Sequence, residues 1–181
     1  FVITDENGYY STPIRRKMRY YMKAQKVRFF ADTASINTFT ASDTTTRFIR
    51  NFYLDRIPVG EIQIEGIYYD YNKWDIRPES EVNLFKLLSF LNINNNIIVE
   101  LSSHTDSRGK DDYNLELSGK RAQSVVDWLV THGIDTKRLK PAGYGKTRHV
   151  VMDAQTEEDH QKNRRTSFEV IGEDYNSKKK K

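Results

Sequence analysis

The sequence contains no cysteine, so it has no disulfide framework, no cysteine-ligated zinc and no thiol nucleophile. Long apolar runs are also missing. The mean hydropathy is -0.75, and no stretch approaches the roughly 20 apolar residues that a membrane span needs. Residues 1–3 lack the basic region and the apolar length of a signal peptide. We therefore expect no membrane-spanning segment, and a chain that starts part-way into a longer parent protein.

An excess of basic charge is absent outside the end of the chain. The net charge is +4, and Lys178 to Lys181 carry all of it. The neutral remainder does not indicate a partner that is a nucleic acid. We interpret the lysine run as a solvated tail, with an anionic surface as the alternative partner. Aromatic residues, in contrast, make up 12% of the 181 residues, which indicates a chain that folds around a core.

The sign of the charge changes along the chain near Pro58. Residues 1–58 hold ten lysines and arginines against five acids, whereas residues 59–177 hold fifteen against twenty. A composition shift of this kind is typical of a domain boundary. We predict a first module over residues 1–58, a second domain over 59–173 and a Lys-rich tail over 174–181.

The first module has the pattern of a small antiparallel β-sandwich. Asn7-Gly8 is a hairpin signal, because both residues tolerate positive φ. Strand-like runs occur at residues 1–3, 19–22, 27–30 and 47–54. The predicted fold class of this part is therefore all-β.

After Pro58 the pattern alternates between strands and helices, which predicts an α+β domain. Strands are expected at residues 62–70, 97–101, 138–144 and 166–171, and helices from Pro78, over 112–131 and over 157–163. The expected buried helical positions are Val82, Phe85, Leu88, Leu91, Leu115, Ala122, Val125, Val126 and Leu129. This order predicts a mixed sheet of β-α-β-α-β type with helices packed on it and a right-handed crossover.

One acid and one base are expected to lie together after the strand at 97–101. Asp106 lies in the loop that follows this strand, where α/β sheets usually bind ligands. Asn114 and Arg121 are two helical turns apart, about 10 Å, and share a stripe of the next helix. A carboxylate and a guanidinium together can recognise a zwitterion such as an amino acid. The alternative is an internal ion pair between Asp106 and Arg121.

Several motifs follow in a fixed order between residues 67 and 171. They are His104-Thr105-Asp106-Ser107-Arg108-Gly109, Tyr113-Asn114, Ser118, Lys120-Arg121-Ala122-Gln123, Gly133-Ile134-Asp135, Arg138-Leu139, Gly143-Tyr144-Gly145 and Asn163-Arg164-Arg165-Thr166. In this order and spacing the region resembles the OmpA C-terminal-like domain of the OmpA, Pal and MotB type. The first module resembles a partial carboxypeptidase regulatory-like, or transthyretin-like, β module.

The resemblance implies non-covalent binding of peptidoglycan through the diaminopimelate of its stem peptide. This residue carries an ammonium and a carboxylate at its side-chain end, which agrees with the zwitterion hypothesis. By resemblance, Asp106 and Arg121 form the central pair, and either Arg164 or Arg165 completes the carboxylate site. The positions that line the family's groove are matched by Asn72, Thr105 and Asn114. Trp74 departs from the family, which usually has a small or polar residue there.

We expect no catalytic residue, no metal and no cofactor. The four histidines have no metal-site spacing, and His104 is interpreted as a residue that orients the loop. Gly143-Tyr144-Gly145 precedes no long helix, so it predicts a turn and not a phosphate loop. A cell-wall hydrolase is one alternative function. A structural module for protein–protein interaction, with an internal Asp106–Arg121 ion pair, is the other.

The implied location is the periplasm of a Gram-negative cell, in association with the cell wall. Attachment to the outer membrane is expected to come through the parent protein. The parent is expected to tie an outer-membrane, secretion or motility assembly to the wall, an expectation that rests on the company of the two domains.

Overall fold

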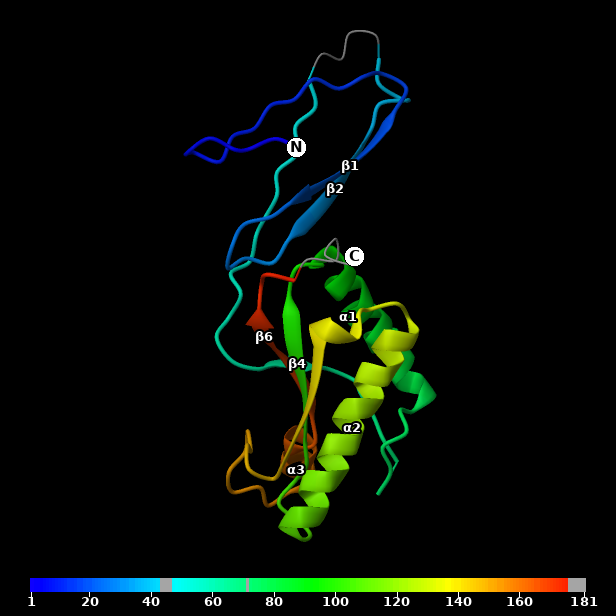
Figure 1. Ribbon diagram of the computed structural model, residues 1–181, viewed down its shortest axis with the longest axis vertical. Helices are drawn as coiled ribbons and strands as arrows, with labels where there is room; N and C mark the ends of the chain where they lie inside the picture. The colour runs from blue at the N-terminus through cyan, green and yellow to red at the C-terminus, as the bar shows by residue number, and fades with distance from the viewer. Residues whose placement is uncertain (43–46, 71, 176–181) are drawn as a thin grey trace.

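The computed structural model of the chain describes residues 1–42, 47–70 and 72–175. Figure 1 shows a small hairpin at one end of the long axis and a larger body of sheet and helices below it. The elements are β1 (Arg19–Ala24), β2 (Asp32–Asn37), β3 (Ile62–Ile64), the 3₁₀ turn η1 (Pro78–Ser80), α1 (Glu81–Ile93), β4 (Ile98–His104), α2 (Asp111–Thr131), the 3₁₀ turn η2 (Thr136–Arg138), β5 (Leu139–Gly145), α3 (Glu157–Asn163) and β6 (Thr166–Gly172).

The body contains a four-stranded sheet with the strand order β3-β6-β4-β5. Strand β4 runs parallel to β5 and antiparallel to β6, and β3 runs antiparallel to β6. Because two parallel neighbours need a long crossover, α2 connects β4 to β5. The predicted mixed α+β fold is therefore confirmed, and the helices and the last three strands lie within a few residues of their predicted ranges.

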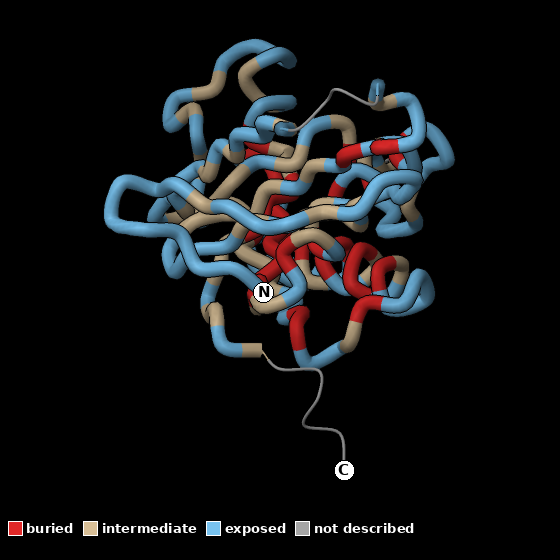
Figure 2. The backbone as a smooth tube through the Cα atoms, turned by 90° about the horizontal axis from the view of Figure 1, so that it is seen from above, coloured by how far each residue is buried: buried red, intermediate tan, exposed pale blue. Residues whose placement is uncertain are grey.

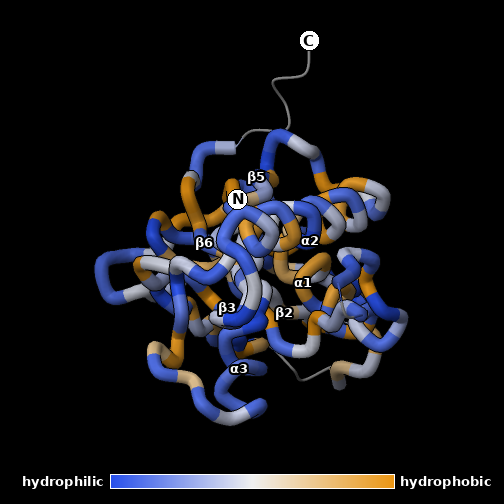
Figure 3. The backbone as a smooth tube through the Cα atoms, turned by 90° about the horizontal axis from the view of Figure 1, so that it is seen from below, coloured by the Kyte–Doolittle hydropathy of each residue, from blue (hydrophilic) through white to orange (hydrophobic). Residues whose placement is uncertain are grey.

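The core lies between the sheet and the two long helices. Alternate residues of β4, Val99 and Leu101, are fully buried against apolar side chains of α1 and α2. The other core members include Leu84, Leu87, Leu91, Val125, Val126, Leu129 and Phe168. Figure 2 shows buried residues at the centre of the fold and exposed ones around it, and Figure 3 shows apolar segments near α1 and α2 while α3 is hydrophilic.

Three predicted core positions are wrong. Val82 and Phe85 of α1 are 64% and 47% exposed, and Leu115 of α2 is 52% exposed. Helix α1 is apolar on more than one stripe, so its periodicity does not select the buried one, and the structure buries Leu84 and Leu87. In the first half of α2 the inward stripe is polar, so the apolar pattern misassigns the buried face there.

The N-terminal part contains one small antiparallel sheet, formed by β1 and β2 with Arg19 opposite Asn37. The expected antiparallel pairing is therefore present, but its second strand is β2, which sequence reasoning missed. Residues 1–3 and 47–54 are not strands, and Phe29 of the predicted run at 27–30 makes only an isolated bridge to Arg56. Asn7-Gly8 does form a tight turn, closed by the bond from Gly8 N to Asp5 O.

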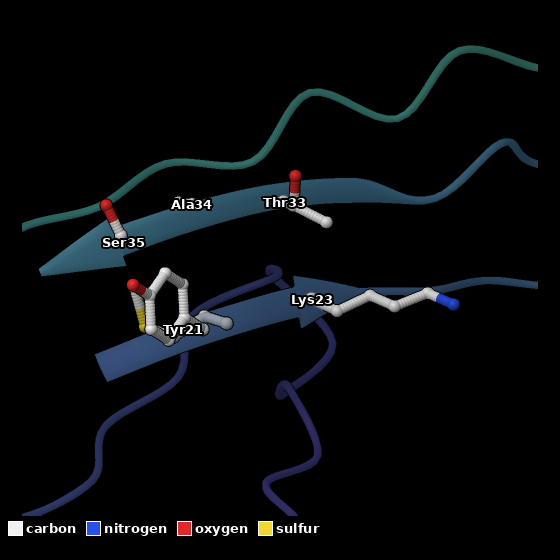
Figure 4. Close-up of a pocket in the computed structure, with 6 residues that line it drawn as sticks. Tyr21, Lys23, Thr33, Ala34 and Ser35 are labelled. Carbon is white, nitrogen blue, oxygen red and sulfur yellow. The ribbon is translucent and has the colours of Figure 1, made fainter. Parts of the chain in front are cut away.

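The hairpin carries a hollow on its surface (Figure 4). Its lining includes Tyr21 and Lys23 from β1 and Thr33 and Ser35 from β2, and no residue of the predicted site. The hairpin lies at the top of Figure 1, whereas α2 begins at the bottom, beside α3. The hollow is therefore remote from the predicted site.

The hairpin contacts the body at the turn between α1 and β4. The backbone N–H of Ala31 donates to Asn94 Oδ1 at 2.7 Å, and Lys23 Nζ donates to Asn95 Oδ1 at 2.9 Å. The ring of Phe30 lies edge-on to Phe90, with 4.9 Å between centroids. Residues 176–181 of the predicted Lys-rich tail lie outside the described residues. Within the described residues, every helix is too short or too polar to span a bilayer.

Candidate functional site

The loop that follows β4 is fixed against the end of β5. The N–H of Thr105 donates to the carbonyl of Gly145 at 2.8 Å, and the N–H of Gly145 donates to Ser118 Oγ at 2.8 Å. Gly145 has φ +50°, and a Cβ there would come within 3.0 Å of the backbone N of Leu115. Strand β5 therefore ends against the first turns of α2, beside the loop that carries Asp106.

Gly143 lets α2 approach β5 closely. A Cβ at Gly143 would lie 2.2 Å from the backbone N of Gly119 and 2.6 Å from its Cα. No side chain fits this gap, because backbone atoms of α2 close it. The prediction of a turn at Gly143-Tyr144-Gly145 is wrong, since all three residues belong to β5 and the glycine is needed for helix–strand contact.

The contact places a polar stripe of α2 on the inside of the fold. Asn114, Ser118 and Arg121 are spaced four and three residues apart, so they lie on one face of the helix. They are 5%, 0% and 8% exposed. The predicted stripe of Asn114 and Arg121 is thus confirmed, and it points to the interior beside the β4–α2 loop.

Asp106 is buried and carries hydrogen bonds on both carboxylate oxygens. Its Oδ1 accepts the backbone N–H of Arg108 at 3.1 Å. Its Oδ2 accepts Nε and Nη2 of Arg108 at 3.1 and 2.6 Å, and Nη1 of Arg164 at 2.6 Å. The carboxylate is therefore fixed by two arginines that come from its own loop and from the end of α3.

Glu157 completes a closed network of four charges. It accepts Nη1 of Arg108 at 3.0 Å and Nη2 of Arg164 at 2.5 Å. A capping box of Thr156 and Asp159 starts α3 at this point, so the helix presents Glu157 in its first turn and Arg164 just after its end. Two arginines thus lie between two carboxylates.

The network controls the protonation of Asp106. Burial disfavours the charged carboxylate, but the hydrogen bonds from Arg108 and Arg164 outweigh it and lower the pKa of Asp106 from 3.8 to about 2. The same contacts raise the pKa of Arg108 above its usual value. Asp106 is therefore an anion at any physiological pH.

Arg121 reaches from α2 to the segment before η1. Its Nε donates to the carbonyl of Lys73 at 2.9 Å and its Nη2 to the carbonyl of Asp70 at 3.4 Å. The guanidinium carbon lies 4.7 Å from the centre of the Tyr69 ring. Burial lowers the pKa of Arg121, and charges on Tyr69, Tyr113 and Asp106 oppose this shift. The guanidinium is held between an aromatic face and two carbonyls.

Asp106 and Arg121 form no ion pair with each other in the part of the chain that the structure describes. Asp106 is paired with Arg108 and Arg164, and Arg121 binds backbone carbonyls. The two charges still influence each other through space, because Asp106 acts to raise the pKa of Arg121. The alternative in which the pair closes on itself is therefore not what the structure contains.

Comparisons with known proteins identify the family of the chain. The sequence model of the OmpA family matches residues 68–164, which is more than half of the chain. The chain belongs to the OmpA family. It is 34% identical over 88 residues to a peptidoglycan-associated lipoprotein of Mesorhizobium japonicum. The aligned region is 49% of this chain and 52% of that protein. It is 36% identical over 115 residues to outer membrane porin F of Pseudomonas fluorescens, covering 62% of this chain and 35% of the porin.

Solved structures share the fold of this chain. The cell wall anchor of the T6SS from Pseudomonas aeruginosa is 26% identical, with a TM-score of 0.53 over 62% of this chain and 80% of that one. The peptidoglycan-associated lipoprotein from Burkholderia pseudomallei has the same fold, with a TM-score of 0.52 over 56% of this chain and 86% of that one. The chain spans about half the length of the peptidoglycan-associated lipoproteins that it matches.

Three of the other predicted residues lie differently with respect to Asp106 and Arg121. Asn114 Nδ2 donates to the carbonyl of Arg108 at 2.7 Å and so fixes the loop. Thr105 is buried, and its hydroxyl donates to the carbonyl of Asp106 at 3.1 Å. Asn72 is exposed, with φ +56° in a turn. Of the three, Asn114 and Thr105 shape the loop that carries Asp106, whereas Asn72 makes no hydrogen bond to either charge in the part of the chain that the structure describes.

The two neighbouring arginines after α3 point to different partners. Arg164 contacts Asp106, as described above. Arg165 instead donates to the carbonyl of Arg148 at 2.9 Å and to Glu61 at 3.3 Å. The alternation of side chains entering β6 explains the split. Of the two predicted candidates, only Arg164 belongs to the network around Asp106.

Arg165 belongs to a polar cluster on the sheet face that α1 and α2 do not cover. His104 is fully buried there, with Nε2 3.0 Å from Glu61 Oε2 and its ring stacked on Tyr144. Burial and the charge of Arg165 lower the pKa of His104 to about 4, so the ring is neutral at pH 7. Nε2–H therefore donates to Glu61, and His104 fixes the end of β4, as expected for a residue that orients the loop.

Sequence reasoning missed two members of the site. Arg108 lies within the quoted motif but had no assigned role, and Glu157 was placed only as the start of a helix. The spacing of Asp106 and Arg108 could have indicated a local bond, but the approach of α3 is a tertiary event that no local pattern shows. Among the described residues, no group of three or more histidine, aspartate or glutamate side chains could hold a metal ion.

Proposed function

We propose that this chain binds peptidoglycan non-covalently and anchors a larger envelope protein to the cell wall. The support is membership of the OmpA family together with relatives that are named for this association, a peptidoglycan-associated lipoprotein and a cell wall anchor. The proposed location is the periplasm of a Gram-negative cell, at the wall. The parent protein would supply attachment to the outer membrane or to a secretion or motility assembly.

The proposed ligand group is the side-chain end of diaminopimelate in the stem peptide. Its ammonium would bind Asp106 and its carboxylate would bind Arg121. The observation that carries this assignment is that the two charges lie near each other without pairing, each with capacity left for a ligand.

That capacity can be counted atom by atom. A carboxylate oxygen has two lone pairs, and Asp106 Oδ1 uses one of them, for the N–H of Arg108. A guanidinium has five N–H groups, and Arg121 uses one on Nε and one on Nη2. Among the described residues, Nη1 of Arg121 has no hydrogen-bond acceptor. The ligand ammonium can therefore donate to Oδ1, while the ligand carboxylate accepts from Nη1.

Arg108, Arg164 and Glu157 have a positioning role in this proposal. They hold the Asp106 carboxylate ionised and fixed before the ligand arrives, so little ordering remains to be done on binding. Charge-assisted hydrogen bonds contribute about 1.5–3 kcal/mol each, which gives a single site an affinity in the micromolar to millimolar range. The wall offsets this weakness, because it is a polymer that presents many stem peptides.

The proposal is for a binding protein and not an enzyme. Glu100, an acid that could serve a hydrolase, is buried on the sheet face that α1 and α2 do not cover, and it pairs with Lys140 and Tyr144. Asp106 has a pKa of about 2, which suits a permanent anion and not a general acid at neutral pH. For residues 1–58 we propose a separate spacer of the carboxypeptidase regulatory-like kind, joined to a binding domain over 59–173 that a Lys-rich tail follows.

The test is sedimentation with purified sacculi that contain diaminopimelate. Wild-type protein should pellet with them, and Arg121→Ala should lose most of this binding while keeping its circular dichroism spectrum. Arg15→Ala, which removes an exposed arginine of the N-terminal segment, is the matched control and should bind like wild type. If Arg121→Ala binds the sacculi as well as wild type does, the assignment of the ligand site is wrong. Release of soluble muropeptides would favour a hydrolase instead.

A further inference from the structure

An exposed tryptophan lies directly beside the proposed ligand site. Trp74 follows Lys73, whose carbonyl accepts the hydrogen bond from Arg121, and its side chain is 42% exposed. Tryptophan is usually mostly buried, because its large apolar surface is costly to leave in water. The other tryptophan of the chain, Trp128, is partly buried and packs against the core. The exposure of Trp74 therefore needs a reason.

The Trp74 ring is held in place and does not hang free. Lys120 Nζ lies 4.4 Å from the centre of the ring, within cation–π distance. The same ammonium pairs with Glu116 at 2.6 Å, one turn earlier on α2. The bond from Arg121 to Lys73 fixes the neighbouring residue to α2 as well. The indole is thus fastened to the helix at two adjacent points and keeps a large part of its surface open.

A second exposed aromatic ring lies along the same helix. Tyr113 is 44% exposed and precedes Lys120 by seven residues, which is close to two turns or about 10 Å. Residues seven apart share a stripe, so Tyr113 and the Lys120–Trp74 contact lie on one line of α2. This line runs beside the buried stripe of Asn114 and Arg121. Tyr113 is also close enough to Arg121 to influence its pKa.

The surroundings of this aromatic line fit a small amphipathic ligand better than a protein. Charged side chains flank the Trp74 ring, since Lys120 lies over it and pairs with Glu116, and Lys73 precedes it in the chain. A sugar ring has such a character, because its C–H face packs on an aromatic face while its hydroxyls bond to polar groups at the rim. Lys120 and Glu116 provide a donor and an acceptor at that rim.

We infer that Trp74 and Tyr113 form a platform on which a sugar ring of the glycan strand stacks when the adjacent charges hold the stem peptide. The inference rests on the proposed function, since the occupant is the sugar to which that stem peptide is joined. A peptide spans at most about 3.5 Å per residue, so a sugar that is joined a few residues from the bound diaminopimelate can lie about 10 Å away, over Trp74 and Tyr113. The chain would then bind the stem peptide and the glycan strand at the same time.

The test compares two probes that differ only in the sugar. One is a free stem peptide that contains diaminopimelate, and the other is the same peptide on its disaccharide. Isothermal titration should show that wild-type protein binds the second probe about tenfold more tightly, which corresponds to about 1.4 kcal/mol. Trp74→Ala should abolish this difference and leave the affinity for the free peptide unchanged. Trp74→Phe, which keeps an aromatic face, should retain most of the difference.

The control is Tyr53→Ala, which removes a tyrosine that is 77% exposed in the N-terminal part and should change neither affinity. Equal affinity of wild type for the two probes overturns the platform but leaves the stem-peptide site standing. The same holds if Trp74→Ala weakens both probes alike, because the residue then only supports the charged site. Failure of both probes to bind overturns the proposed function together with the platform.

Discussion

Replacing Asp106 by asparagine tests whether the charge network around it has the strength that its geometry implies. The change keeps the shape of the side chain and removes its negative charge, which leaves Arg108, Arg164 and the nearby Arg121 with one carboxylate fewer. Both stability and ligand binding should suffer. Stability is the sharper readout, because it needs no assumption about the ligand.

The magnitude follows from the pKa of Asp106. The shift from 3.8 to about 2 corresponds to about 2.5 kcal/mol of stability at neutral pH, because each unit is worth about 1.4 kcal/mol. The folded-state pKa is lowered, so this contribution is complete above about pH 4 and is lost as the pH falls towards 2. The deficit of Asp106→Asn relative to wild type should therefore be about 2.5 kcal/mol at pH 7 and shrink below pH 4.

Urea unfolding followed by circular dichroism measures both quantities. Asp153→Asn, in an exposed turn before α3, is the matched control and should cost less than about 0.5 kcal/mol. A deficit of the same size at pH 7 and pH 2.5 would refute the argument from the ion pairs. So would a pKa near 3.8 for Asp106 in an NMR titration of the carboxyl carbon.

Three further changes probe the scaffold. Gly143→Ala should lower the free energy of unfolding in urea by about 3 kcal/mol, because the new methyl group clashes with the backbone of Gly119. Gly119→Ala is the control: its methyl group contacts no other atom, so the change should raise the free energy of unfolding by about 0.5–1 kcal/mol. Equal changes for the two variants would contradict the close contact between α2 and β5. His104 should stay neutral in the folded protein down to about pH 4, whereas in the unfolded chain it is protonated below about pH 6.5. The free energy of unfolding should therefore fall as the pH drops from about 6.5 to 4, and a pKa above 6 for His104 by NMR would contradict this. Arg138→Met should cost about 3 kcal/mol, because the buried guanidinium donates to the carbonyls of Leu91, Asn94 and Ile97, and a thermal shift within error of wild type would count against this.

The elements that the sequence predicts well are those with strong local signals. Helix α3 has the predicted limits because Thr156 and Asp159 form a capping box at its start. Helix α2 ends at His132-Gly133 as expected, since Gly133 adopts φ +95° and stops the helix. Strand β2 gives no such signal, because its residues are mostly small and polar and pair only when β1 is already in place.

The buried face of α2 shows why the site resists prediction from pattern alone. Apolar periodicity places Leu115 inside, but Asn114 and Ser118 take the inner face where the helix meets β5 and the loop of Asp106. Polar residues occupy buried positions there because they position charges, so the rule that relates burial to hydrophobicity fails at the site. The choice between Arg164 and Arg165 likewise depends on the alternation at the start of β6.

The central charges themselves were predictable, and their partners were not. A loop after a buried strand and a helical stripe make Asp106 and Arg121 candidates, and the family resemblance makes them the expected central pair. That Asp106 is paired with Arg108 and Arg164, while Arg121 binds the carbonyls of residues 70 and 73, follows from tertiary contacts.

The most direct test of the account is an NMR titration of the wild-type protein with two stem peptides that differ in one group. One contains diaminopimelate, and the other contains lysine, which has the same ammonium but lacks the side-chain carboxylate. The account predicts that the diaminopimelate peptide shifts the resonances of Asp106 and of the Arg121 guanidinium, and that the lysine peptide binds at least tenfold more weakly. Equal binding of the two peptides, or shifts elsewhere in the protein with these two side chains silent, would contradict it.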